Sequence, residues 1–591
     1  CNEAQERYVL VIGRTDLERF EAMAKRERCL YAVIGEISGD QKLTLADSLL
    51  GADPIPAIDL EVFLGNPPRM LRDVTRLEPA LPALDFAGIS IAAAAERVLR
   101  FPAVAAKTFL ITIADRTVTG LIARDQLIGP YQVPVSDVAL TTHSFKGYTG
   151  SAMAMGERTP LAVIDAPASG RIAVAEAVTN IAAAHIGPIH KIKLSGNWMC
   201  ACGEEGEDAN LFDTVYSIGM EFCPQLGISI PVGKDSLSMR AVWQDSQNRD
   251  HKIVAPMSLV VSAFAPVDDA RQVATPQLVG DTDTKLLLID LGRGRNRLGA
   301  SCLAQVYNQT GDSGPDVDAN DLRQLYDALQ DLHAQQLILA YHDRSDGGLF
   351  STVAEMVFAG RCGIDLDISD LADDALAALF SEEIGVVIQH HATATEKIEA
   401  ILHARGLSEL THTIGHPNAA RELVIRHNGA ELYRASTISL HATWAELSYQ
   451  MQAQRDNPDC AREEYAAISD AADPGLNFER SYEIAPVHIS SGARPRLAIL
   501  REQGVNGQVE MAAAFDAAGF ESVDLTMTDL IEGRAALMDF QGLVACGGFS
   551  YGDVLGAGAG WARSVLFNGK LREQFSIFFA RPDTFSLGVC N

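Results

Sequence analysis

The run RIAVAEAVTNIAAA occupies residues 171–184 and organises the middle of the chain. Its small and β-branched apolar residues predict a buried helix. Glu176 and Asn180 lie four residues apart, so both side chains leave the same face of that helix. A carboxylate and an amide oxygen on an otherwise apolar helix suit a hard divalent cation that also contacts phosphate oxygens. In isolation, however, the pattern is more often a buried Glu and Asn held by neighbouring backbone groups.

Upstream of this helix, the sequence predicts a strand and then a loop. GSAMAMGERTP, residues 150–160, is rich in small residues and predicts the loop. Residues 132–135 predict a strand that contains proline, and Ser136 and Asp137 follow at its end. Acidic residues at strand ends are typical of ligand sites in α/β and α+β proteins, although a single Asp there is most often structural.

A distant segment, YHDRSDGGL at residues 341–349, is the expected partner of these residues. Residues 338–341 predict a strand and residues 349–359 predict a helix, so the acidic residues and the glycine pair fall between them. Backbone amides at the start of that helix can hold a phosphate while Asp343 contacts a cation. The alternative is an ordinary turn in which an Asp caps the helix.

The composition restricts the classes of partner. The chain has 591 residues, enough for about three to five domains, with a net charge of −29 and a pI of about 4.8. Such an acidic surface repels nucleic acid and anionic membranes, so neither is an expected partner. The ten cysteines show no disulfide spacing, which favours a reducing, cytoplasmic location. No apolar run reaches the length needed to span a membrane.

The order strand, helix, strand occurs twice with similar spacing. The first occurrence is predicted at residues 8–12, 17–28 and 31–34. The second is predicted at residues 385–388, 396–405 and 411–416. We interpret this as an internal duplication in which only the tail of the first copy is present. The chain begins at Cys1 rather than Met, which fits an N-terminal truncation.

The last quarter of the chain has a different pattern of predicted elements. Residues 441–494 are polar and predict a linker. After it, strands are expected at 496–500, 523–525 and 542–546, with a helix at 509–518, which argues for an open parallel sheet. The chain ends with a strand that enters Gly-Val-Cys, the beginning of a nucleophile elbow in which a sharp turn exposes Cys590.

Together these motifs closely resemble phosphoribosylformylglycinamidine synthases of the large single-chain form, a family also called FGAM synthetase or FGAR amidotransferase. The matching stretches occur in family order over nearly the whole chain: QVPVSD (132–137), AMAMGERTP (152–160), EAVTNIAAA (176–184), KIKLSGNWM (191–199), PVGKDSLSM (231–239), YHDRSDGGL (341–349), GGFSYGDVLGAG (547–558) and LGVCN (587–591).

The resemblance implies an α/β and α+β multidomain fold that contains a second aminoimidazole-ribonucleotide-synthetase-like, ATP-binding repeat and the first part of a class I glutaminase with a flavodoxin-like parallel sheet. The expected divisions are a remnant of the first synthetase repeat at 1–75, the ATP- and magnesium-binding domain of the second repeat at 85–268, its C-terminal α/β domain at 280–440, the linker at 441–494, and the glutaminase part at 495–591.

The family is a group of ligases that form C–N bonds with glutamine as nitrogen donor. Its members convert formylglycinamide ribonucleotide (FGAR), glutamine and ATP into formylglycinamidine ribonucleotide (FGAM), glutamate, ADP and phosphate in de novo purine biosynthesis. The resemblance therefore implies Mg²⁺ and ATP or ADP as cofactors, and a cytoplasmic protein that is monomeric in its full-length form. The catalytic ATP loop is expected before Cys1 and the His and Glu of the glutaminase triad beyond Asn591, so this piece is not expected to catalyse the full reaction.

The resemblance also carries residue roles onto this sequence. The implied magnesium ligands are Asp137, Glu176, Asn180 and Asp343. The implied nucleotide contacts are Ser136 and Ser345. In the glutaminase part, Cys590 resembles the nucleophile, and the backbone N–H groups of Gly548 and Asn591 are the candidates for holding the oxyanion.

Three other functions remain open at this point. The first is an aminoimidazole-type ATP-dependent ligase, which would need no glutaminase segment. The second is a non-catalytic scaffold that binds nucleotide without turnover. The third is a cysteine hydrolase of flavodoxin-like fold, which would not explain residues 85–440.

Overall fold

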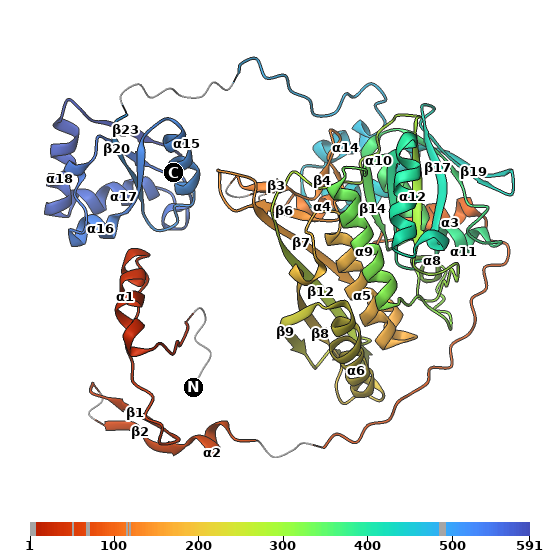
Figure 1. Cartoon of the computed structure of the whole chain (residues 1–591), viewed down its shortest axis with the longest axis horizontal. Coiled ribbons are helices and arrows are strands. Elements are labelled where there is room, and N and C mark those ends of the chain that lie inside the picture. Colours follow the sequence, from red (N-terminus) through yellow and green to blue (C-terminus); the bar gives the residue numbers. More distant parts are fainter. Residues whose placement is uncertain are drawn as a thin grey trace. The chain divides into compact units, whose positions relative to one another are not determined.

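The computed structural model describes residues 7–49, 52–66, 71–113, 116–117, 120–483 and 492–590. The chain divides into two compact units, Cys1–Asp73 and Val74–Asn591. The elements of each unit can be followed in Figure 1. Among the described residues, every helix is too short or too polar to cross a membrane.

The first unit is small and holds one antiparallel strand pair. Its elements are η1 (Arg14–Asp16), α1 (Leu17–Arg26), β1 (Lys42–Asp47), β2 (Ala52–Asp59) and α2 (Leu60–Leu64). The helix predicted at 17–28 is confirmed by α1, but the strands predicted at 8–12 and 31–34 are wrong. Tyr8, Val9 and Leu30 are largely exposed in irregular backbone. An apolar run forms a strand only where a neighbouring strand accepts its backbone hydrogen bonds, and the described part of the chain provides none there.

The first sheet of the second unit has six strands in the order β3-β6-β7-β12-β8-β9, antiparallel except for the β8–β9 pair. Its strands are β3 (Ile122–Arg124), β6 (Ala139–Thr142), β7 (Gly150–Glu157), β8 (Lys193–Met199), β9 (Ser229–Ser236) and β12 (Ser258–Val267). Smaller pairs are β4 (Leu127–Ile128) with β5 (Val133–Pro134), and β10 (Arg240–Gln244) with β11 (Asp250–Val254).

The segment predicted as a loop at 150–160 is largely the strand β7, so that prediction is wrong. Its small residues serve close packing rather than a turn, because the helix α5 (Ala166–Ile181) lies directly against this strand. A Cβ on Gly156 would lie 2.2 Å from the backbone oxygen of Ala173 in α5. The predicted buried helix is confirmed: Asp165 caps it by accepting a hydrogen bond from Ala168 N at 2.8 Å, and most of its residues are buried.

The second sheet has seven strands in the order β14-β16-β13-β17-β15-β18-β19. Its strands are β13 (Thr284–Asp290), β14 (Ala340–Arg344), β15 (Gly363–Asp367), β16 (Gly385–His391), β17 (Thr411–Asn418), β18 (Glu422–His427) and β19 (Ala430–Ser436). Two predictions are confirmed here: the strand, acidic turn and helix around 338–359, now β14 and α10 (Gly348–Gly360), and the strand, helix, strand order of β16, α12 (Thr395–Ala404) and β17.

The remaining helices of this region are short or flank the sheets. They are α3 (Ile91–Arg100), α4 (Thr108–Ile111), η2 (Thr159–Val163), η3 (Ile189–Lys191), α6 (Glu207–Tyr216), the π-helical η4 (Ser217–Phe222), α7 (Cys223–Leu226), α8 (Cys302–Val306), α9 (Ala319–Ala334), α11 (Ala375–Phe380), η5 (Ala392–Ala394) and η6 (Ser408–Leu410).

The prediction of a linker at 441–494 is wrong for the first half of that segment. Helices α13 (Thr437–Arg455) and α14 (Pro458–Ala467) occupy this region and pack against each other. Trp444 is buried, and its indole N–H donates to Val104 O at 2.7 Å. The polar composition is that of one exposed helix face, and the buried face consists of isolated residues such as Trp444 and Ala461 that are easily missed.

The C-terminal segment forms a four-stranded parallel sheet in the order β21-β20-β22-β23. Its elements are β20 (Arg496–Arg501), α15 (Gln508–Ala517), β21 (Glu521–Thr526), α16 (Met527–Glu532), η7 (Leu537–Asp539), β22 (Gly542–Ala545), η8 (Ser550–Gly552), α17 (Ala557–Leu566), α18 (Gly569–Ala580) and β23 (Phe585–Gly588). Leu497, Ala498, Ile499 and Leu500 of β20 are all buried, as expected for a strand covered on both faces. The predicted parallel sheet is confirmed.

Candidate functional site

Two carboxylates from distant parts of the chain meet in the second unit. Asp137 follows β5, Asp343 lies on β14, and the Asp343 N–H donates to Asp137 Oδ1 at 3.3 Å. Their side chains are 1% and 6% exposed. In each carboxylate the second oxygen, Oδ2, is buried and has no hydrogen-bond partner among the described residues. Unpaired buried carboxylate oxygens are unfavourable unless a cation or a donor satisfies them.

His342 fixes the position of Asp137. Its Nδ1 lies 2.7 Å from Asp137 Oδ1 and its Nε2 lies 2.8 Å from Glu355 Oε2. Burial alone lowers the pKa of His342, but the charges and hydrogen bonds of Asp137 and Glu355 outweigh it and raise that pKa well above its ordinary value. Because both ring nitrogens are engaged by carboxylates, His342 holds Asp137 in position beside Asp343.

Glu176 and Asn180 are both tied to β7. Glu176 Oε2 accepts a hydrogen bond from Glu157 N at 2.8 Å, and Asn180 Nδ2 donates to Met155 O at 3.0 Å. This is the backbone-satisfied arrangement that the sequence left open, and it uses one polar atom of each side chain. Burial, followed by the charges of Asp343 and Asp346, raises the pKa of Glu176 well above its ordinary value. The structure therefore brings Glu176 into the electrostatic field of the Asp137–Asp343 pair.

The electrostatics of this group favour a cation. Burial, together with the neighbouring Asp137, raises the pKa of Asp343 to about 8. Carboxylates repel one another when they are buried together, and each proton taken up relieves that repulsion. A divalent cation relieves it more completely, and unpaired carboxylate oxygens are the hard ligands that Mg²⁺ prefers. The residues present thus fit a magnesium ion.

A second buried acidic cluster lies behind the acidic turn. Asp346 and Glu382 both pair with the buried Arg158, which comes from the end of the β7 segment. Glu382 Oε1 also accepts hydrogen bonds from Gly347 N at 2.7 Å and Cys302 N at 2.9 Å. Because a fixed guanidinium already pairs with both carboxylates and Glu382 holds two backbone N–H groups, the cluster positions the 345–348 turn.

The glycine pair in this turn is required by its backbone. Gly347 and Gly348 have φ of 80° and 65°. A Cβ on Gly348 would lie 2.6 Å from the backbone oxygen of Ser381, so this position favours glycine both by its φ and by the space available. Ser345 opens the turn, and its carbonyl accepts from Gly348 N at 3.0 Å. Ser136 Oγ donates to Val138 O at 2.8 Å, so its hydroxyl is already used by the backbone.

Sequence reasoning did not find His342, Glu355 or Arg158. A usable signal existed for Glu355, because it is the one carboxylate in the otherwise apolar helix α10. His342 and Arg158 gave no comparable signal, because their importance depends on partners that are far away in the sequence.

Cys590 lies at the end of β23 with an exposed thiol. Its φ of 60° is a left-handed conformation that non-glycine residues rarely adopt, as expected for a nucleophile at a sharp turn. A Cβ on Gly547 would lie 2.6 Å from Cys590 Cβ, and one on Gly548 would lie 2.6 Å from Asn506 N. The Gly547 backbone therefore lies beside the thiol, and Gly548 packs against the 504–506 segment. Asn591 lies outside the described residues.

Three family models match the chain in succession. They are the FGAR-AT PurM_N-like domain at residues 106–266, the C-terminal domain of AIR synthase related proteins at 284–428, and the CobB/CobQ-like glutamine amidotransferase domain at 494–591. The chain thus combines an AIR-synthase-related unit with a glutamine amidotransferase domain. This set of domains supports a protein of the phosphoribosylformylglycinamidine synthase type, in agreement with the motifs, and confirms the predicted multidomain α/β fold class.

Comparison with solved structures gives matches of low identity. T. maritima PurL complexed with ATP has 14% identity and a TM-score of 0.38, over 51% of this chain and 47% of that one. T. maritima PurL complexed with FGAR has 13% identity and a TM-score of 0.40, over 51% and 49%. E. coli HypE, a hydrogenase maturation protein, has 17% identity and a TM-score of 0.35, over 48% and 84%. The chain spans about half the length of the PurL chains it matches.

Proposed function

We propose that this chain is part of an enzyme that uses ATP and glutamine to convert FGAR into FGAM in purine biosynthesis. The observation that carries the proposal is the presence, in one chain, of an FGAR-AT PurM_N-like domain and a glutamine amidotransferase domain. The products would be FGAM, glutamate, ADP and phosphate. The proposed partners are ATP, L-glutamine and FGAR, and a monomeric, cytoplasmic protein remains a prediction.

In this proposal, Asp137, Glu176, Asn180 and Asp343 hold Mg²⁺, and Ser136 and Ser345 contact the nucleotide. The unpaired Oδ2 atoms of both aspartates support the assignment. When bound, the cation supplies positive charge between these carboxylates and the phosphates of ATP or ADP. His342 orients Asp137, and Glu382 holds the Gly347 N–H, so the acidic turn is fixed before the ligand arrives.

The amidotransferase role falls to Cys590. Its thiol would give up its proton and attack the side-chain amide carbon of glutamine. The C–N bond then breaks, the leaving nitrogen takes up that proton and departs as ammonia, and a glutamyl thioester remains on the sulfur until water hydrolyses it to glutamate. The negative charge on the amide oxygen would be held by backbone N–H groups of Gly548 and Asn591. The left-handed backbone at Cys590 and the adjacent glycine backbone support this role.

A second candidate is a nucleotide site that binds without turnover. The rigid, hydrogen-bonded environment of Glu176, Asn180 and the acidic turn favours it for this half of the chain. The two candidates are compatible if the nucleotide here is structural and the chemistry takes place elsewhere in the natural protein.

The first experiment measures the nucleotide and magnesium content of the purified chain, and its thermal shift with ADP and Mg²⁺. Asp343→Ala should abolish retained nucleotide and the shift, and Asp373→Ala, an exposed carboxylate of the same domain, should leave both unchanged. A wild-type chain with neither nucleotide nor shift would contradict the assigned ligands.

The amidotransferase half is tested in the natural protein that carries this sequence. Cys590→Ala should remove FGAM formation from glutamine and keep FGAM formation from added ammonia, because the thiol acts only on glutamine. Loss of both activities in a folded variant would contradict the role of Cys590, and retention of both would do the same.

A further inference from the structure

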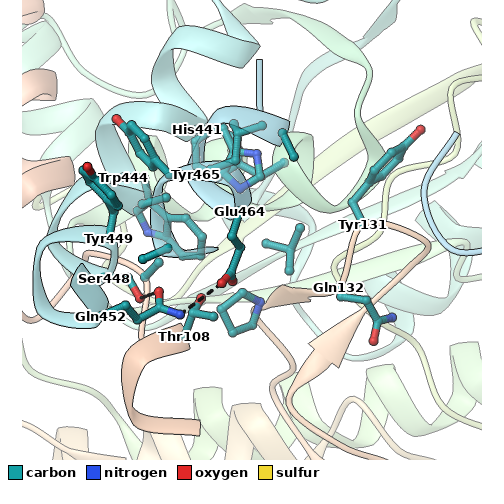
Figure 2. Close-up of a pocket in the computed structure, with 18 of the residues that line it drawn as sticks. Thr108, Tyr131, Gln132, His441, Trp444, Ser448, Tyr449, Gln452, Glu464 and Tyr465 are labelled. Carbon is teal, nitrogen blue, oxygen red and sulfur yellow. Dashed lines mark hydrogen bonds between the residues drawn. The ribbon is translucent and has the colours of Figure 1, made fainter. Parts of the chain in front are cut away.

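A separate pocket of about 250 Å³ lies in the second unit. It is bounded by α13, α14, the end of α10 and the β4–β5 hairpin (Figure 2). None of the residues assigned above to the nucleotide, the cation or the thiol chemistry lines it. Its walls are unusually aromatic, with Tyr131, Phe358, His441, Trp444, Tyr449 and Tyr465.

Two of the aromatic side chains, Trp444 and Tyr465, are held in place by hydrogen bonds from their polar ends. The Trp444 indole N–H donates to Val104 O at 2.7 Å, and the Tyr465 hydroxyl donates to Ala442 O at 3.0 Å. Tyr449 stacks on Tyr465 with ring centroids 4.7 Å apart. Because these polar ends are already bonded, the walls offer mainly aromatic surface to a ligand. The pocket is therefore preorganised for a flat molecule.

The one cation among the lining residues is not available to a ligand. Arg361 lies over the Tyr131 ring, 4.4 Å from its centroid, and donates to Ile468 O at 3.3 Å and to Asp473 Oδ2 at 3.4 Å. Two carboxylates, Asp473 and Glu464, also line the pocket, so its charge is net negative. A phosphate group would be repelled there.

Two lining side chains keep hydrogen-bonding capacity. Glu464 Oε2 accepts from Gln452 Nε2 at 3.1 Å, and Glu464 Oε1 has no hydrogen bond within the described part of the chain. In the view of Figure 2, Glu464 lies between the Tyr449–Tyr465 side and Tyr131. The His441 ring stacks on Phe358 at 4.8 Å, and its nitrogens likewise make no hydrogen bond to a described residue. Burial and the nearby Arg361 lower its pKa to about 4, so at pH 7 it offers one donor and one acceptor.

We propose that this pocket binds a planar nitrogen heterocycle of the nucleobase class, as the free base or the nucleoside and without a phosphate. The aromatic walls would stack on the ring, Glu464 would accept from ring or exocyclic N–H groups, and His441 would pair with the polar edge. The volume is just below the roughly 300–1,000 Å³ of typical ligand pockets, which restricts the ligand to a single small molecule such as a base or a nucleoside. This inference is independent of the proposed function.

The test measures binding of adenine, adenosine, guanine, guanosine and AMP to the whole chain by equilibrium dialysis, with ADP and Mg²⁺ present to fill the other nucleotide site. At least one base or nucleoside should bind saturably at one per chain, and AMP should bind at least tenfold more weakly than adenosine. Glu464→Ala should weaken binding at least tenfold, and Glu463→Ala, at a neighbour that is also exposed but does not line the pocket, should not change it.

A blocking pair of variants makes the test independent of charge. Ala467 is exposed and lines the pocket, and Ala466 is exposed and does not line it. Ala467→Phe should abolish binding and Ala466→Phe should preserve it, without loss of folding in either, because both positions face solvent. No saturable binding of any base or nucleoside, binding that survives Glu464→Ala and Ala467→Phe, or AMP binding as tight as adenosine would each overturn the proposal.

Discussion

Replacing Asp343 by Asn tests the electrostatics of the candidate cation site directly. Burial and the neighbouring Asp137 raise the pKa of the Asp343 carboxyl to about 8, so in the metal-free protein it holds a proton at neutral pH. A cation ligand must be ionised, so binding of Mg²⁺ has to release that proton. Asn keeps nearly the same shape and has no proton to release.

The number of protons released when Mg²⁺ binds follows from the pKa of Asp343. With a value of about 8, roughly nine tenths of the Asp343 carboxyls are protonated at pH 7, about half at pH 8 and about one tenth at pH 9. At saturating Mg²⁺, the wild type should therefore release about one proton more than Asp343→Asn at pH 7, and the difference should nearly vanish at pH 9. The raised pKa of Asp343 also predicts how the affinity for Mg²⁺ depends on pH. Because a proton competes with the cation for Asp343, Mg²⁺ binding by the wild type should weaken nearly tenfold, about 1.4 kcal/mol, from pH 7 to pH 6.

Isothermal titration in buffers of different ionisation enthalpy counts the released protons. Glu396→Gln, which removes an exposed carboxylate on α12, is the matched control and should behave as the wild type. Glu176 also has a raised pKa and should release protons in both the wild type and Asp343→Asn. The informative quantity is therefore the difference in proton release between the two proteins. Equal proton release by wild type and Asp343→Asn at pH 7 would refute a protonated Asp343 that ionises when the cation binds.

Three further outcomes are expected. His342→Gln should keep the fold and weaken Mg²⁺ binding about 10- to 100-fold in titrations, because it removes a positioning partner of a ligand; unchanged affinity would contradict that role. Arg158→Met should lower stability by about 3–5 kcal/mol in thermal unfolding by leaving Glu382 buried and unpaired, and adding Glu382→Gln should recover part of it; no recovery would contradict the pairing. Iodoacetamide at pH 8, followed by mass spectrometry, should label the exposed Cys590 before Cys302, because burial raises the pKa of the Cys302 thiol to about 12; equal rates would contradict this.

The parts of the fold that could be predicted are those encoded locally. The helix that carries Glu176 and Asn180, the strand, turn and helix around Asp343, and the parallel strands that end at Cys590 all follow from short periodic patterns and turn residues. The positive φ of Gly347 and Gly348 is also implied by the residues themselves.

The parts that could not be predicted depend on distant partners. The sequence of β7 resembles a loop because its residues are small. They are small because the helix α5 packs closely on this strand, as the approach of Gly156 to Ala173 shows. Helices α13 and α14 look like a linker because their buried residues, such as Trp444, are few. His342 becomes important only through Asp137, which lies about two hundred residues earlier in the chain.

The charges around the site explain why a divalent cation suits it better than a monovalent one. Asp137 and Glu355 are bridged by the charged ring of His342, which leaves one negative charge among the three. Asp343 and Glu176 are the two acids whose pKa values burial and their neighbours raise, so they are the two that a cation would ionise. A monovalent ion would leave several of these charges unbalanced in a buried space. Two positive charges, shared with the phosphates of a nucleotide, would hold the proposed ligands together in their ionised forms. Occupancy of the site would then be coupled to the packing of α5 against β14.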